Sequence, residues 1–270
     1  MKTKNCSASL RKKLPLVLAL LLSLAPLLVL SQQPMYAIVE YMKTKPGKEW
    51  NYIELERNFW KPVHVERIRQ GEIVGWMLYR IRYTAGNDPY NYATVTLFNQ
   101  TENLEQPGTI DPLTVHPDKD VENWLTETDE SRELVIRNLL IQQNFIVPNG
   151  EGGDPKFLEV DYMKVKQGND LPYRDLENKI WKPVHQQLIQ SGTRTGWSVW
   201  ARLYPSGYGM DYQYMTINEL ANFSQIALPD YEKAIKSAHP HRKVDDIRHK
   251  TNQLRTLVKS ELWELLDAAY

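Results

Sequence analysis

The chain contains the same module twice. The pentapeptide Trp-Lys-Pro-Val-His at 60–64 recurs at 181–185, an offset of 121 positions. The flanking residues repeat in the same order, and the offset grows to 122 and then 123 through small insertions. A unit this long exceeds any solenoid repeat, so it predicts two similar subdomains about a pseudo-twofold axis. Matched pairs include Glu40 with Asp161, Tyr41 with Tyr162, Gly75 with Gly196, Trp76 with Trp197, Tyr92 with Tyr214 and His116 with His239.

The first repeat is expected to span residues 35–147 and the second 156–270, joined by a proline- and glycine-rich linker at 148–155. Within each repeat, alternating apolar residues indicate strands and helical spacing indicates helices. The first repeat has predicted strands at 36–45, 73–83, 90–98 and 138–147, and helices at 48–70 and 117–137. The second has predicted strands at 157–166, 196–204, 212–220 and 260–265, and helices at 171–190 and within 229–257. A helix is the alternative for 260–265.

The order strand, helix, strand, strand, helix, strand is the split βαβ or ferredoxin-like arrangement, an α+β fold. Its helices cover one face of an antiparallel sheet and leave the other face apolar. Two such repeats in one chain are therefore expected to pack their four-stranded sheets face to face, as a barrel-like sandwich.

This topology resembles the dimeric α+β barrel superfamily in tandem-fused form, over nearly all of residues 35–270. The resemblance rests on strand order, the length of each half and the aromatic strand pair after the first helix, and no family within the superfamily is assigned. Families that share the barrel include haem-degrading monooxygenases, cofactor-independent quinol monooxygenases and lactone isomerases. The resemblance implies a fold and a pocket between the long helices and the sheet, but no particular activity.

Residues 1–31 are expected to be a cleaved signal peptide, because five basic residues precede the apolar run at 14–30. A retained membrane anchor is the alternative. Cleavage would remove Cys6, the one cysteine, and leave 28 basic against 33 acidic residues, a net charge of −5. That balance argues against nucleic acid as a partner and against a membrane surface after cleavage. The predicted location is secreted or periplasmic, and the oligomeric state is left open.

Each repeat carries a Glu, Trp, His series at four-residue spacing, which places the three side chains on one helical face. Pro62 and Pro183 follow the tryptophans and should kink the helix or begin a new segment. One hypothesis is that His64 and His185 are catalytic acids, bases or ligand contacts, with the tryptophan as a pocket wall. The alternative is a packing role. The other members of the series are Glu56, Trp60, Glu177 and Trp181.

Four strand aromatics, Tyr79, Tyr92, Trp200 and Tyr214, are candidates to line a pocket or to fill the core. The histidines of the two His-Pro pairs are expected to act as caps or surface groups. The spacing of His239 and His241 could bind a metal, but no other ligand cluster stands near them, so no metal site is predicted. Arg80 and Arg82 correspond to Ala201 and Leu203, which indicates that the two halves have diverged.

No phosphate-binding loop, nucleophile elbow or thiol nucleophile occurs in the expected mature chain. Three functions stay open. The first is a protein with an internal small-molecule pocket. The second is a haem-using or cofactor-free monooxygenase of the barrel type, haem being the one cofactor that the resemblance suggests. The third is a non-catalytic interaction module, which an exposed apolar patch without a cavity would favour.

Overall fold

The computed structural model describes residues 34–105, 108, 110–146, 154–207, 209–227 and 229–270. The expected signal peptide and residues 148–153 of the expected linker lie outside these ranges. No helix within them is long and apolar enough to cross a membrane.

The first half forms four strands with helices after the first and third of them. The elements are β1 (Tyr36–Thr44), α1 (Glu49–Leu55), η1 (Glu56–Trp60), α2 (Lys61–Arg69), β2 (Gly75–Ile81), β3 (Tyr92–Phe98), α3 (Glu102–Glu105), α4 (Pro112–Val115), α5 (Val121–Ser131) and β4 (Arg132–Ile146).

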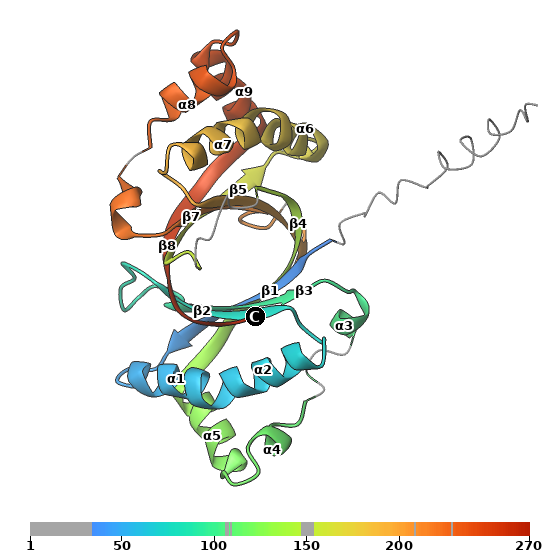
Figure 1. Ribbon diagram of the computed structural model, residues 1–270, viewed down its shortest axis with the longest axis vertical. Coiled ribbons are helices and arrows are strands. Elements are labelled where there is room, and N and C mark those ends of the chain that lie inside the picture. Colours follow the sequence, from blue (N-terminus) through green and yellow to red (C-terminus); the bar gives the residue numbers. More distant parts are fainter. Residues whose placement is uncertain (1–33, 106–107, 109, 147–153, 208, 228) are drawn as a thin grey trace, which may run out of the picture. The chain divides into compact units, whose positions relative to one another are not determined.

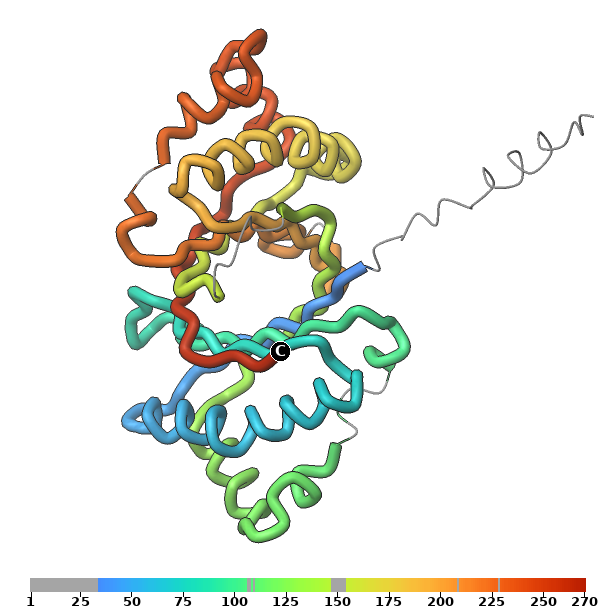
Figure 2. The backbone as a smooth tube through the Cα atoms, in the orientation of Figure 1, coloured from blue at the N-terminus to red at the C-terminus, as the bar shows by residue number. Residues whose placement is uncertain are grey.

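The second half repeats this order. Its elements are β5 (Phe157–Val165), α6 (Asp170–Leu176), η2 (Glu177–Trp181), α7 (Lys182–Gln190), β6 (Gly196–Tyr204), β7 (Tyr214–Leu220), η3 (Phe223–Ile226), α8 (Tyr231–Ala238), α9 (Val244–Leu254) and β8 (Arg255–Ala269). Figure 1 shows the helices of the two halves on opposite outer sides of one barrel, and the chain trace in Figure 2 follows the same path in both halves.

The eight strands form a closed antiparallel barrel in the order β1-β3-β2-β8-β5-β7-β6-β4. Each half contributes its strands in the ferredoxin-like order 4-1-3-2. The expected barrel of two four-stranded sheets is therefore observed, and the two sheets join along both edges. Closure satisfies the edge N–H and C=O groups that two separate sheets would leave unpaired.

The long strands β4 and β8 close the barrel. Residues 132–141 of β4 pair with β1 in the same half, and residues 139–146 pair with β6 in the other. Strand β8 does the same with β5 and then β2. The predicted helix at 117–137 was therefore too long, because residues 132–137 pair with β1. The predicted strand at 260–265 is confirmed, within a strand of 15 residues.

The long helix of each half contains a π-turn immediately before its proline. The backbone N–H of Lys61 donates to the carbonyl of Glu56, five residues earlier. A new α-helical segment then begins, as expected, with Pro62 in its first turn, where no N–H is needed. The Nε2–H of His116 donates to the carbonyl of Phe59 within the π-turn, at 3.0 Å. His239 and Ile180 repeat this contact at 2.9 Å. The two imidazoles therefore hold the π-turns, while the backbones of His116 and His239 form the C-caps of α4 and α8.

Two layers of apolar side chains result. One face of every strand points into the barrel, where a single cluster draws residues from all eight strands. The other face packs against the helices in separate clusters for the two halves. Trp263 of β8 belongs to the inner cluster and is 1% exposed. Because β8 pairs with strands of both halves, the inner cluster is the core that they share.

We expect Trp263→Ala to lower the free energy of unfolding by about 3–5 kcal/mol, because it leaves a cavity in the shared core. Trp50→Ala is the matched control, because Trp50 is 69% exposed on α1, and it should change stability by no more than about 0.5 kcal/mol. Urea denaturation followed by circular dichroism measures both. Equal losses in the two variants would contradict a shared inner core.

Candidate ligand-binding site

The barrel lumen contains a cavity of about 410 Å³. Most of its lining is aliphatic, and its aromatic lining residues include Tyr79, Trp200 and Trp263 of the inner cluster. Strand alternation explains the lining, because every second residue of each strand faces inward. Volumes of this size are typical of small-molecule pockets. The aliphatic residues include Ala37, Val39, Met77, Val95, Leu97, Leu140, Leu158, Met215 and Ile217.

Beyond these aromatics, a tyrosine cluster fills the lumen. Tyr41 and Tyr162, which are matched by the duplication, meet with their hydroxyls 3.1 Å apart. The Glu261 carboxylate accepts hydrogen bonds from Tyr162 at 2.6 Å, Tyr90 at 2.9 Å and the Trp263 indole at 3.0 Å. Burial raises the pKa of Tyr41 and Tyr162 well above the usual 10.0, so both hydroxyls stay neutral. The cluster forms a hydrogen-bonded floor beneath the cavity.

Glu219 places a carboxyl group in the apolar cavity. It lies on β7 two residues after Ile217 and faces the same way. Its cross-strand neighbour is Gly196, where a Cβ would meet the carboxyl oxygen at 2.2 Å. The glycine therefore creates the space for the carboxyl group. Burial raises the pKa of Glu219 above its ordinary value of 4.5.

The sequence-predicted site residues divide into three groups. Tyr79 and Trp200 line the lumen cavity. Tyr92 and Tyr214 lie under the helices, with ring centroids 5.1 Å from Tyr52 and 4.7 Å from Tyr173, respectively. The six residues of the Glu, Trp, His series belong to the helix–sheet layers. The structure therefore does not bring the ten candidates together at one site.

The three side chains of each series contact different elements. In the first half the imidazole of His64 stacks on Trp76 of β2, at 5.0 Å and 15°, while the indole of Trp60 donates to Thr128 of α5 at 3.2 Å. In the second half His185 stacks on Trp197 at 4.9 Å and 16°, and Trp181 donates to Thr251 of α9 at 3.2 Å. Burial, with Arg67 or Arg194 nearby, lowers the pKa of His64 and His185 to about 3. Both imidazoles are neutral packing groups at neutral pH.

Glu56 and Glu177 are buried carboxyl groups at the start of the π-turns. Burial raises the pKa of each to about 7, against the opposing effects of Arg132 and Tyr52 in the first half and of Arg255 and Tyr173 in the second. Because the folded pKa is raised, the stability that these groups contribute is present below about pH 4.5 and is lost as the pH rises through about 7.

Glu177 also borders a second concavity, a groove of about 550 Å³ at the rim of the helix–sheet layer. The groove lies between α6 with η2 and strands β4 and β6, and its lining is largely polar. Arg174, Asn178 and Asn144 contribute to it, and the last two are hydrogen-bonded to each other at 2.9 Å. This groove lies between helix and sheet, where the sequence resemblance implied a pocket.

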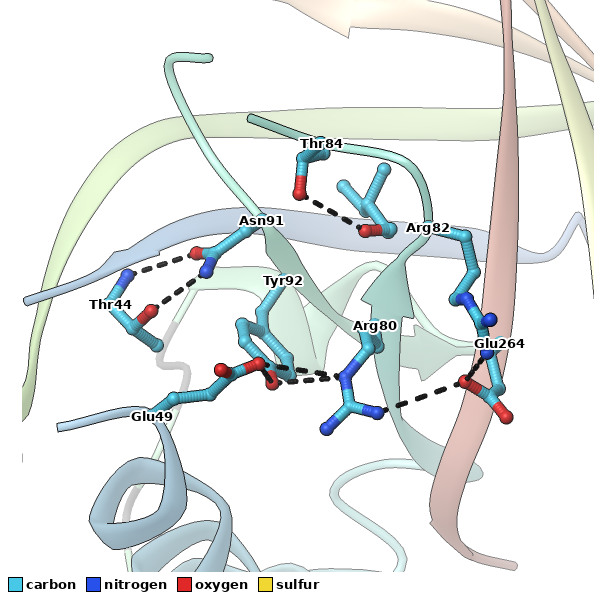
Figure 3. Close-up of polar contacts among 9 residues, drawn as sticks. Thr44, Glu49, Arg80, Arg82, Thr84, Asn91, Tyr92 and Glu264 are labelled. Carbon is cyan, nitrogen blue, oxygen red and sulfur yellow. Dashed lines mark hydrogen bonds and ion pairs between the residues drawn. The ribbon is translucent and has the colours of Figure 1, made fainter. Parts of the chain in front are cut away.

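Arg80 and Arg82 lie at the seam between the halves (Figure 3). Arg82 forms an ion pair with Glu264 of β8 at 2.8 Å, and Arg80 donates to the Tyr92 hydroxyl at 3.1 Å. Arg80 also approaches Glu49 within 3.7 Å. These asymmetric arginines therefore join β2 to β8 and do not face the lumen cavity.

The helix histidines do not fit an axial haem ligand. His185 is 6% exposed and is enclosed by Trp181, Trp197 and Tyr231. Neither His185 nor His64 lines any of the four concavities found on the described residues. A haem would have to displace the stacked indole. Across the described ranges, no three His, Cys, Asp or Glu side chains gather as a metal site.

Glu219 and Glu261 are not among the residues predicted from the sequence. The duplication contained a signal for both, because Glu219 corresponds to Leu97 at an offset of 122 and Glu261 to Asn138 at 123. At these inward-facing strand positions, one repeat has a charged residue and the other repeat has an uncharged residue. The lumen is therefore not symmetric there.

No family model and no curated protein sequence matches this chain. Solved structures do match it. A candidate monooxygenase from Fusobacterium nucleatum is 12% identical, over 88% of this chain and 94% of the other, with a TM-score of 0.56. A candidate chlorite dismutase is 10% identical, over 87% and 96%, with a TM-score of 0.49. A haem-binding protein from Thermus thermophilus is 7% identical, over 87% and 92%, with a TM-score of 0.48.

At these identities the comparisons concern the fold alone. Together with the closed barrel and the 4-1-3-2 order of each half, the Fusobacterium match confirms the expected dimeric α+β barrel fold, here in one tandem-fused chain. The fold leaves the activity open, because function depends on the site and not on the barrel.

His185→Gln should reduce the acid sensitivity of the fold. The folded pKa of His185 is depressed to about 3, so on acidification the unfolded chain takes up a proton near pH 6.5 before the folded protein does. Between pH 7 and pH 5 this destabilises the wild type by about 2 kcal/mol. The variant should lose about that much less free energy of unfolding over the same interval, measured with urea at both pH values. His249→Gln, at an exposed position on α9, is the control. An unchanged pH dependence in His185→Gln would contradict the neutral packing role.

Proposed function

We propose that this protein is an exported binding protein that holds an apolar small molecule in its barrel lumen. The observation that carries the proposal is the cavity of about 410 Å³, lined by one cluster from all eight strands. Export rests on the basic and apolar pattern of residues 1–31.

The lining favours binding in two ways. Transfer of an apolar ligand from water to this apolar surface is favourable by a free energy of about 25 cal/mol per Å² buried. Its walls are strands of a closed barrel, and the Tyr79 and Trp263 rings pack with centroids 5.6 Å apart. When a ligand enters a preformed cavity of this kind, the protein loses little conformational entropy.

A cofactor-free oxygenase is the second candidate. The specific observation for it is Glu177, whose pKa of about 7 matches proton abstraction near neutral pH, at a groove lined also by Arg174. The Fusobacterium protein with this fold carries the description of a monooxygenase. In such a reaction the base would remove a hydroxyl proton from a quinol, and the resulting anion would react with oxygen.

An interaction module is supported less well. Apolar side chains are exposed on the outer parts of the long strands, at Leu134 and Val135 of β4 and Leu257 and Val258 of β8, each 40–46% exposed. These residues lie in two short runs, and the protein also has the internal cavity that this hypothesis would not need.

Binding is tested with N-phenyl-1-naphthylamine, a neutral apolar dye that fluoresces in apolar sites. The wild type should bind the dye, and Val95→Trp should abolish binding because the indole fills the lumen. Val65→Trp makes the same change at an exposed position on α2 and should bind like the wild type. Equal binding by both variants, or no binding by the wild type, would contradict a lumen site.

The oxygenase candidate is tested by oxygen uptake with 1,4-dihydroxynaphthalene, corrected for uptake without protein. If it holds, the wild type accelerates uptake, and Glu177→Gln slows it by about a hundredfold or more. Glu56→Gln, at the matched carboxyl that does not border the groove, should retain the wild-type rate. Uptake no faster than without protein would rule out this candidate for quinols.

A further inference from the structure

At one matched position, one wall of the lumen carries an apolar residue and the other an acid. In the first half the cross-strand pair is Gly75 with Leu97, and in the second half it is Gly196 with Glu219. Both glycines leave room at the cavity. The ring of Tyr270 occupies the space at Gly75, 3.1 Å from where a Cβ would be, whereas the Glu219 carboxyl occupies the space at Gly196. The second wall therefore presents an acid where the first presents leucine.

Among the residues that the structure describes, nothing neutralises this acid. The described contacts include no hydrogen bond and no ion pair to the Glu219 carboxyl oxygens, and burial is the one cause of its raised pKa. Glu261, by contrast, has the ammonium group of Lys259 at 2.6 Å. A partly buried carboxyl group without a partner is costly to the folded protein. A cation placed beside it would relieve that cost.

The rest of the cavity limits what that cation can be. The lining around Glu219 is apolar, and the other polar side chains, Tyr79, Gln142, Ser198 and Tyr270, are uncharged at neutral pH. The Ser198 hydroxyl already accepts the Trp200 indole N–H at 2.9 Å. An inorganic cation favours several charged oxygen ligands, and among the described residues no three His, Cys, Asp or Glu side chains gather as a metal site. A protonated amine on an apolar body needs one carboxylate and an apolar surface.

Building on the proposed lumen site, we infer that Glu219 is the recognition group for the cationic nitrogen of an apolar amine. The apolar body lies against the inner cluster, and the ammonium group donates to the Glu219 carboxylate. Because the fold already removes part of this carboxyl group from bulk water, less of its desolvation cost remains to be met on binding. Charge-assisted hydrogen bonds of this kind are among the stronger polar contacts in proteins.

The test is displacement of N-phenyl-1-naphthylamine at pH 8 by three probes of equal chain length: octylamine, octanol and octanoate. The wild type should bind octylamine about tenfold or more tightly than octanol, and octanoate most weakly because of charge repulsion. Glu219→Gln keeps the shape but removes the charge, so the preference for octylamine should fall to about twofold or less. Glu219→Leu, which copies Leu97 of the other wall, should reverse the preference towards octanol.

Glu232→Gln is the control, because it removes an exposed carboxylate on α8 and should keep the wild-type preference. Dye binding by each variant shows that its lumen is intact. If the dye binds but octylamine and octanol displace it equally from the wild type, or Glu219→Gln and Glu219→Leu keep the amine preference, the inference is overturned while the lumen site stands. If the wild type binds no dye, the proposed function fails and the inference falls with it.

Discussion

Closure of the barrel by β4 and β8 is the constraint on which the rest of the structure depends. Each of these 15-residue strands pairs first with its own half and then with the other. A strand shared in this way cannot pair fully unless both halves are folded. The same closure turns one face of every strand inward, and so creates both the common core and its cavity.

The side chains under the helices and those inside the barrel have different roles. Under the helices, the stacked pairs of His64 with Trp76 and His185 with Trp197 fill the space, and the π-turns give the prolines a place in a continuous helix. These features occur in both halves, as expected for packing that the fold requires. Some of the differences between the halves face the lumen, at positions 219 and 261, where a ligand or the hydrogen-bonded floor can make use of them.

The duplication and the strand and helix periods predicted the fold in most respects. They placed the strand at 196–204 with its observed bounds and the helix at 171–190 within one residue of its start. The barrel was predicted, but the pairing of β4 with β6 and of β8 with β2 was not, because these partners come from distant sequence and leave no local pattern. Of the site residues predicted from the sequence, Tyr79 and Trp200 line the lumen cavity. Glu219 was missed because one acid in an alternating strand looks like a solvent-facing residue, and its place in the cavity lining became clear only in the structure.

The Tyr41–Tyr162 contact marks where the pseudo-twofold axis passes through the lumen. In an assembly of two identical polypeptides, every mutation near that axis appears on both walls at once, so a new acid would face its own image and both would be repelled. Fusion into one gene removes this restriction, because each wall mutates alone. A lumen with leucine at 97 and glutamate at 219 needs two walls of different sequence, which a homodimer cannot have.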